Sequence, residues 1–213
     1  MHNSESGELF FCLLPEPDAA DFITACKNTG KSLCSRHRYM EDAPHLTLYA
    51  AWFSANREHD LCAIRFNFIH SMKNVSVRLG GWHRFNNDPL TGGTTLAVRI
   101  DQRDMTALGS IQQRVISTAA PLRHPELLPR YRNAAFSDPA VIKSLSECGF
   151  PFAGAHWFPH ITVASFLGDN AEETVCRIER NAPPEKCKFT ALALCRVMSR
   201  GFTVIKKWET GEP

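Results

Sequence analysis

One short pattern occurs twice in this chain, and it limits the possible folds more than any other feature. Residues 44–48 read Pro-His-Leu-Thr-Leu, and residues 159–163 read Pro-His-Ile-Thr-Val. Apolar residues follow both copies, so each copy is expected to begin a β-strand. Side chains alternate between the two faces of a strand, so residues two apart project together. The pairs that would share a face are His45 with Thr47 and His160 with Thr162.

The composition is that of a globular protein with a mild charge. The chain has 213 residues, 44% of them hydrophobic, which is enough for one substantial core. Its formal net charge is +2 at pH 7. This balance permits an anionic substrate, but it does not indicate a basic surface that coats duplex nucleic acid.

The cysteines and the first residues bear on the cellular location of the protein. Eight cysteines are scattered without a Cys-x-x-Cys pair and lie mostly in apolar runs, which predicts reduced, buried thiols. The polar start, MHNSESGE, predicts no secretory signal, and no apolar run is as long as a membrane span. We therefore expect a soluble, cytoplasmic protein without a membrane partner.

The first half of the chain reads as strand, helix, strand, helix, strand. An apolar run closed by prolines predicts a buried strand over 9–14, and Asp18 is a suitable N-cap for a helix over 19–33. The helical spacing predicts a buried stripe made of Phe22, Ile23, Cys26 and Leu33. The elements that follow are the motif strand over 45–53, a helix over 58–72 and a strand over 75–85.

The same order starts again after residue 90. The expected elements are strands over 94–100 and 160–167, helices over 105–119 and 170–180, and a hairpin over 187–198 and 202–208. The halves share almost no identity outside the motif, so the order of elements is repeated and the letters are not. A duplicated unit with pseudo-two-fold symmetry explains this order and would place the motif strands side by side.

These observations predict an α+β fold in one bilobal domain over residues 1–213. One repeat spans about 8–90 and the other about 94–209. We expect two antiparallel sheets that face each other across a central cleft, with the helices on the outside. An insertion over 121–159 interrupts the second repeat, contains a helical stretch over 138–148, and is interpreted as a flap beside the second motif.

The paired His-x-Thr-x motifs, half a chain apart in a strand and helix context, resemble the 2H phosphoesterase superfamily. That group includes the LigT-type RNA 2′-5′ ligases and cyclic nucleotide phosphodiesterases. The resemblance extends over essentially the whole chain as a pattern, and its specific part is the two motifs. It implies an enzyme that acts on a cyclic or 2′-5′-linked phosphodiester of a nucleotide or short RNA end.

The chemistry of the motif residues agrees with this reading. Cleavage of a phosphodiester by in-line attack needs one group to accept a proton and another to donate one. Histidine suits both roles, so His45 and His160 are the predicted catalytic residues. Thr47 and Thr162 would donate hydrogen bonds to the non-bridging phosphate oxygens. The scheme requires no metal and no cofactor, and the sequence does not say which histidine is the base.

Further residues are candidates for contact with the substrate. Tyr49 lies four residues after His45, so it is expected on the same face of its strand, and Ser165 on the second motif strand is also a candidate to extend the cleft. Arg130, Tyr131 and Trp157 belong to the insertion and are the remaining candidates. A zinc site is the competing interpretation, because His156 and His160 are four residues apart, but Pro159 interrupts the helix that would align them.

Two alternative functions remain open. The first is a nucleotide- or RNA-binding module that keeps the cleft and turns over little substrate. The second is a phosphodiesterase for a small cyclic sugar phosphate, because residues 149–152 (Gly-Phe-Pro-Phe) are similar to the segment before the second histidine in the superfamily branch linked to phosphonate metabolism.

Overall fold

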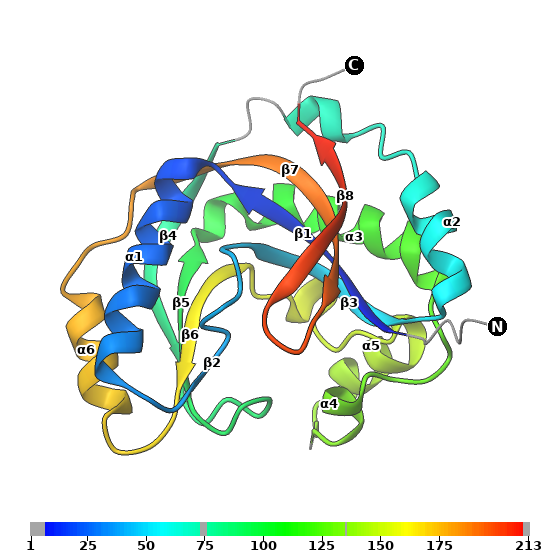
Figure 1. Cartoon of the computed structure of the whole chain (residues 1–213). Helices are drawn as coiled ribbons and strands as arrows, with labels where there is room; N and C mark the ends of the chain where they lie inside the picture. The colour runs from blue at the N-terminus through cyan, green and yellow to red at the C-terminus, as the bar shows by residue number, and fades with distance from the viewer. Residues whose placement is uncertain (1–6, 73–75, 135, 211–213) are drawn as a thin grey trace.

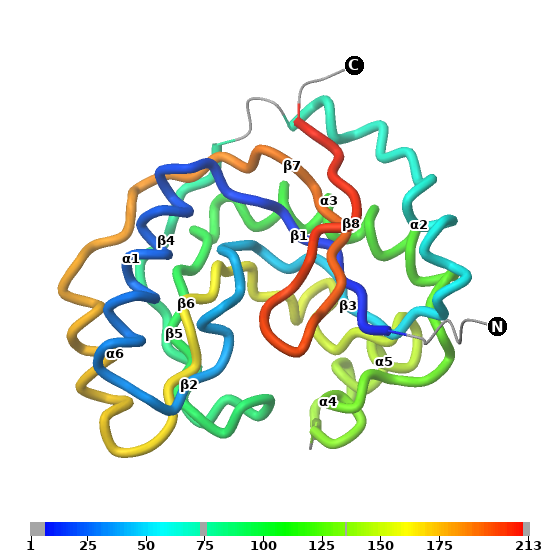
Figure 2. Tube along the Cα trace, in the orientation of Figure 1, coloured from blue at the N-terminus to red at the C-terminus, as the bar shows by residue number. Residues whose placement is uncertain are grey.

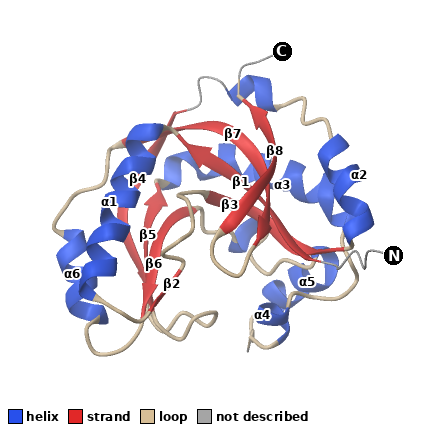
Figure 3. Ribbon diagram, in the orientation of Figure 1, coloured by secondary structure: helices blue, strands red, loops and turns tan. Residues whose placement is uncertain are grey.

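The computed structural model describes residues 7–72, 76–134 and 136–210. Antiparallel strands form the centre of the molecule and helices cover them from outside (Figure 3). The α+β class predicted from the sequence is confirmed. No helix in these described ranges is both long and apolar enough to cross a membrane.

The regular elements are labelled in Figure 1. The strands are β1 (Gly7–Pro15), β2 (His37–Arg38), β3 (Leu46–Phe53), β4 (Ser76–Phe85), β5 (Thr94–Ile100), β6 (His160–Phe166), β7 (Lys186–Val197) and β8 (Phe202–Glu209). The α-helices are α1 (Pro17–Leu33), α2 (Glu58–Ala63), α3 (Met105–Ala119), α4 (Pro129–Arg132), α5 (Pro139–Cys148) and α6 (Ala171–Glu179). Most predicted elements are therefore present within one or two residues of their expected bounds.

The helix predicted over 58–72 is wrong beyond its first part. Helix α2 ends at Ala63, and Ile64 has extended backbone. The Ile64 carbonyl accepts a hydrogen bond of 3.0 Å from the Trp208 indole nitrogen, Nε1, of β8. Phe66 then packs against Trp208, with ring centroids 5.1 Å apart. Tertiary contacts with β8 therefore replace the helical hydrogen bonds that the apolar spacing predicted.

Helix α1 ends at Leu33 as predicted, but its start and its buried stripe differ from the prediction. It begins at Pro17, a favoured first helical residue, so Asp18 lies inside the first turn and is not the N-cap. Leu33, placed in the buried stripe by its spacing, is 39% exposed at the end of the helix. Lys27 is buried in the stripe instead, at 5% exposure.

The described strands form one eight-stranded sheet, and every pairing in it is antiparallel. One group of strands has the order β3-β1-β7-β8, and the other has β2-β6-β5-β4. Strand β7 crosses above both groups, because its start pairs with β4 and the rest pairs with β1 and β8 (Figure 1). The two predicted sheets are therefore joined into one.

The two strand groups do not follow the two halves of the sequence. The group with the first motif strand takes β7 and β8 from the second half, and the group with the second motif strand takes β2 and β4 from the first half. The helices are exchanged in the same way, since α1 packs on β6 and α3 packs on β3. This differs from the expected division near residue 90.

Candidate functional site

The two motif strands meet where their motifs lie. Strand β3 pairs with β6 in antiparallel register, with Leu46 opposite Ile161. The path of the chain in Figure 2 brings these two strands together near the centre of the molecule. Both apolar residues are buried, at 0% and 1% exposure. The side-by-side placement predicted from the repeat is therefore present in the structure.

This register gathers the four polar motif residues on one face. Residues opposite each other in an antiparallel pair point the same way, so His45 lies across from Thr162 and Thr47 lies across from His160. All four side chains are half-buried, whereas their neighbours in the strands are buried. The histidines occupy one diagonal of this arrangement and the threonines occupy the other.

Each imidazole is held by the backbone two residues before it. The His45 Nδ1 lies 2.8 Å from the Ala43 carbonyl oxygen, and the His160 Nδ1 lies 2.6 Å from the Phe158 carbonyl oxygen. A carbonyl oxygen only accepts, so Nδ1 carries the proton in both rings. The Nε2 atoms are therefore the nitrogens left to accept and release protons.

Aromatic side chains enclose both histidines. The His45 ring lies 5.2 Å from Phe10 and 5.0 Å from Phe202, between ring centroids. The His160 ring lies 5.0 Å from Phe85 and 6.0 Å from Phe158. Apolar walls of this kind remove water from the imidazoles and disfavour their charged forms.

Burial lowers the pKa of both histidines. For His45 burial is the largest cause, opposed by the Ala43 carbonyl and by Asp42, while the charge of Lys27 lowers the pKa further. For His160 burial again comes first, the Phe158 carbonyl opposes it, and His45 is among the groups that lower the pKa. This influence of His45 on His160 agrees with the strand register, which brings the two motifs together.

A turn between β4 and β5 supplies a carboxylate near the second motif. Asp88 raises the pKa of His160. Its carboxylate accepts hydrogen bonds of 2.6 Å from Thr95 Oγ1 and 2.9 Å from the Leu90 backbone N–H. Asn87, just before it, has a φ of 52°, one of the two non-glycine positive values in the described residues. This strained turn fixes the position of the carboxylate.

Four of the five further candidates are buried structural residues, so their prediction as substrate contacts is corrected. Ser165 is fully buried with its Oγ 2.7 Å from Thr91 Oγ1. Trp157 is 6% exposed, and its indole donates to the Thr47 carbonyl at 3.1 Å. Tyr131 is 4% exposed beneath Arg130.

Tyr49 is displaced from the expected face by an irregularity in its strand. The pairing of β1 with β3 passes from Phe11–Tyr49 to Cys12–Thr47, so Leu48 is an extra residue that interrupts the alternation. The phenol of Tyr49 is fully buried and donates to the Cys148 carbonyl at 2.7 Å. Burial is the main cause that raises its pKa.

Arg130 is the fifth candidate and stays a prediction. Its side chain is 33% exposed and forms an ion pair with Glu8 of β1. The guanidinium carbon lies 4.7 Å from the centroid of the Tyr131 ring. One side of this cation is thus held by the protein while the rest faces solvent.

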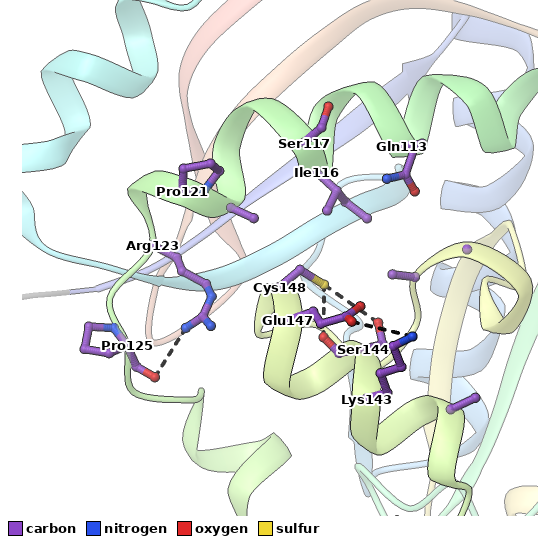
Figure 4. Close-up of a pocket in the computed structure, with 14 residues that line it drawn as sticks. Gln113, Ile116, Ser117, Pro121, Arg123, Pro125, Lys143, Ser144, Glu147 and Cys148 are labelled. Atoms are coloured by element: carbon purple, nitrogen blue, oxygen red, sulfur yellow. Dashed lines mark hydrogen bonds and ion pairs between the residues drawn. The ribbon is translucent and has the colours of Figure 1, made fainter.

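The insertion over 121–159 packs against the first motif strand and does not stand off as a flap. Its backbone is tied to β3 by the His124 N–H, which donates to the Trp52 carbonyl at 2.7 Å, and by the Cys148 carbonyl, which accepts from the Tyr49 hydroxyl at 2.7 Å. A hollow of about 710 Å³ lies where the insertion meets α3 (Figure 4). Arg123 in its wall is bonded to the carbonyls of His124, Pro125 and Ser146. The motif histidines do not line this hollow.

The described residues contain no group of three or more His, Cys, Asp or Glu side chains arranged to hold a metal ion. His156, the partner in the zinc interpretation, lies in a short 3₁₀ turn over Gly154–His156 with its Nδ1 3.9 Å from Asp138. It is therefore not aligned with His160 on a helix.

Sequence reasoning missed two buried polar residues near the motifs, Lys27 on α1 and Gln112 on α3. A signal for Lys27 was present, because it follows Ile23 by four residues on the buried face of α1. A charged residue on a helix is ordinarily solvated, so the sequence alone favours Leu33 over Lys27 for the buried stripe.

Comparison with known proteins agrees with this geometry. The family model described as the 2′-5′ RNA ligase superfamily matches residues 15–199. Among solved structures, E. coli LigT complexed with 3′-AMP is 17% identical with a TM-score of 0.53, over 98% of this chain and 100% of LigT. A structure described as a phosphoesterase is 20% identical with a TM-score of 0.55, over 98% and 100% of the two chains.

A third similar structure is the protein TT0787 of Thermus thermophilus, 14% identical with a TM-score of 0.53, over 96% of this chain and 98% of that one. No curated protein matches the chain.

The structural similarities, at these identities, establish a shared fold. The family match covers most of the sequence and includes both His-x-Thr motifs. The resemblance seen in the motifs is confirmed, and the chain belongs to the 2′-5′ RNA ligase superfamily, the 2H phosphoesterases.

Proposed function

We propose that this protein is a metal-independent phosphodiesterase that opens a 2′,3′-cyclic phosphodiester, or cleaves a 2′-5′ linkage, at a nucleotide or RNA end. Membership of the superfamily supports an enzyme that acts as a phosphodiesterase or a ligase.

The observation that carries it is the register of β3 against β6. With Leu46 opposite Ile161, two imidazoles and two hydroxyls share one face at the junction of the two strand groups. A phosphate on this face meets a histidine from each strand at opposite corners. In-line displacement at phosphorus needs this arrangement, because the attacking and leaving oxygens lie on opposite sides of the phosphorus atom.

The proton transfers follow from the tautomers. The Nε2 of one neutral histidine accepts the proton of the attacking water, and the Nε2–H of the other, protonated histidine donates to the leaving sugar oxygen. In the reverse direction the same two groups exchange roles. No step in this scheme calls for a metal or another cofactor.

The threonines would act on the charge that develops at phosphorus. The hydroxyls of Thr47 and Thr162 lie on the other diagonal of the motif face and can donate to the non-bridging oxygens. A donor that is already oriented needs no rearrangement when the five-coordinate transition state forms. The aromatic walls strengthen these hydrogen bonds by excluding water.

The nucleotide substrate is supported by a protein with the same fold. LigT has been crystallised with 3′-AMP, with NADP⁺ and with phosphate. These are a nucleoside monophosphate, a dinucleotide and the bare anion. A shared fold and paired motifs make the same class of ligand the first to test here.

The test is hydrolysis of 2′,3′-cyclic nucleotides in EDTA by the wild type, His45→Ala and His160→Ala. General acid–base groups contribute about 10²- to 10⁴-fold each, so each variant is expected to lose at least about 10²-fold in kcat. His59→Ala, a change on α2 away from the motifs, is the control and should keep full activity. Equal rates for the wild type and both motif variants would remove these histidines from the chemistry.

The substrate panel should include a ribose cyclic phosphate and a 2′-5′-linked dinucleotide. Faster turnover of the sugar phosphate would favour the phosphonate-type alternative suggested by residues 149–152. Nucleotide binding without product from any substrate would favour the binding-module alternative.

A further inference from the structure

Both motif strands contain a β-bulge immediately after the motif threonine. In β3 the extra residue is Leu48, as described above. In β6 the pairing with β5 passes from Leu96–Ala164 to Ala97–Thr162, so Val163 is the extra residue there. Both bulge residues are fully buried. A bulge residue leaves the regular ladder, and its buried carbonyl needs a donor from elsewhere.

A buried side chain from a covering helix supplies that donor in each case. The Gln112 Nε2 of α3 donates to the Leu48 carbonyl at 3.1 Å, and the Lys27 Nζ of α1 donates to the Val163 carbonyl at 2.6 Å. Gln112 is 0% exposed and Lys27 is 5% exposed. These two residues are the long polar side chains in the buried core of the described chain.

Each of these side chains also binds the segment that leads into the other motif. Lys27 donates to the Tyr39 carbonyl at 2.6 Å, six residues before His45. Gln112 accepts from the Gly154 N–H at 3.1 Å, six residues before His160, and donates to the Phe152 carbonyl at 2.9 Å.

The two anchored residues have nearly the same positive φ. Tyr39 has a φ of 63° and Gly154 has a φ of 61°. Such a conformation is costly for tyrosine and persists when surrounding contacts hold it. Lys27 and Gln112 therefore form two similar bridges. Each one joins the bulge of one motif strand to a residue with positive φ in the loop before the other motif.

We propose that Lys27 and Gln112 are a matched pair of positioning residues that set the two His-x-Thr motifs at the spacing catalysis requires. Each side chain links the bulge of one motif strand to the entry loop of the other motif. The roles given to the motifs rest on the proposed function, whereas the mechanical link between them does not.

Lys27 adds an electrostatic effect that Gln112 lacks. Burial lowers the pKa of Lys27 to about 8, although the nearby carboxylates of Asp42 and Glu41 oppose this. The charged form lowers the pKa of His45. The two bridges are thus alike in hydrogen bonding and different in charge, which allows the two effects to be separated.

The first test compares Lys27→Met and Gln112→Met with Thr174→Val as the matched control. Thr174 is also fully buried, but its hydroxyl bonds the Asn170 carbonyl within its own helix. Misplacement of a catalytic group by about 1 Å costs about 10²-fold, so we expect each methionine variant to lose about that factor in kcat with a smaller change in KM. Thr174→Val should be destabilised without a loss in kcat.

A double variant tests whether the bridges act on the same spacing. Once one bridge is absent the motifs are already misaligned, so Lys27→Met with Gln112→Met should lose less in kcat than the product of the single losses. Independent, multiplicative losses would overturn the matched pair. Where a methionine variant does not fold, Lys27→Gln and Gln112→Asn, which keep an N–H donor in the side chain, replace it and should show a smaller loss of the same kind.

A second readout needs no substrate. In NMR of the free protein, each single variant should change the imidazole chemical shifts of both His45 and His160. The His45 pKa should be raised in Lys27→Met and not in Gln112→Met. Perturbation no greater than in Thr174→Val, or confined to one histidine, would overturn the proposal. Coupled histidines in a protein that hydrolyses no phosphodiester would support the bridges while contradicting the proposed function.

Discussion

At the scale of single residues, the site depends on which ring nitrogen holds a proton. The carbonyls of Ala43 and Phe158 fix Nδ1–H in the two histidines, so both rings present the same atom to a substrate. The surrounding phenylalanines then lower the pKa of both rings by excluding water. One of the rings nevertheless has to be protonated for turnover.

The pH profile follows from these two shifts. Activity needs the base neutral, above its pKa, and the acid charged, below its pKa. Both values lie under the ordinary histidine pKa of about 6.5, so kcat/KM should be bell-shaped with its maximum below pH 6.5. Initial rates at low substrate concentration measure this profile. A maximum above pH 7 would show that the free enzyme does not hold the rings as described.

The role of the two motif threonine hydroxyls can be tested with valine, because its side chain has nearly the same shape as that of threonine. Thr47→Val and Thr162→Val each remove one predicted donor to the transition state, and a loss on the order of 10²-fold in kcat is expected for a donor of this kind. Steady-state kinetics with a cyclic nucleotide measures it. Thr203→Val, on β8, is the control. Wild-type kcat in both motif variants would contradict the role given to the threonines.

The central residues of the site could be predicted from sequence because their pattern is repeated and strand periodicity is simple. Tyr49 could not, since a bulge at Leu48 breaks the periodicity on which its placement relied. The spacing of Lys27 from Ile23 indicates its helix face but not its burial, which depends on two carbonyls that only the folded chain brings near it.

At the scale of elements, the packing of α1 against β6 leaves no room for a side chain at one position. A Cβ on Gly30 would lie 2.7 Å from two ring atoms of Phe166 and 3.5 Å from Ile178 of α6. Gly109 on α3 is the natural comparison, since a Cβ there has nothing within 4 Å. Both glycines are inside helices, so they differ mainly in their surroundings.

Alanine at these two glycines should therefore have opposite effects. Gly30→Ala overpacks the contact with Phe166 and should lower the free energy of unfolding by about 1–3 kcal/mol. Gly109→Ala should raise it by up to about 1 kcal/mol through helix propensity. Denaturant unfolding of both variants measures this. A stabilised Gly30→Ala would show that the helix can move away from the strand at little cost.

Elements with a regular apolar period were predictable, and those shaped by distant contacts were not. The strand over 94–100 and the helix over 105–119 have the bounds expected from sequence. The end of α2 depends on Trp208, which is more than a hundred residues away in the chain. The insertion could be identified by its break in the repeat, but its docking on β3 required the structure.

At the scale of the whole molecule, the cysteines report how tightly the core is closed. Six of the eight are buried, Cys62 is half-buried, and Cys176 on α6 is exposed. Burial raises the pKa of Cys62, which slows its reaction with thiol reagents. The core therefore separates the thiols by accessibility.

A thiol titration should show this separation. In the native protein one thiol should react rapidly and a second slowly, while all eight should react in denaturant. Cys176→Ser should remove the rapid phase, and Cys62→Ser serves as its control. Several rapid thiols in native protein would show that the sheet opens readily in solution.

The exchange of helices and strands between the halves bears on how such a chain could arise. Helix α1 lies on the motif strand of the second half and α3 lies on that of the first, so half a chain alone would leave its motif strand uncovered. Two copies of an ancestral half could complete each other as a swapped homodimer, with both motifs at its two-fold axis. Fusion of the copies would then free each histidine to evolve separately, and a single gene could acquire the insertion on one side only.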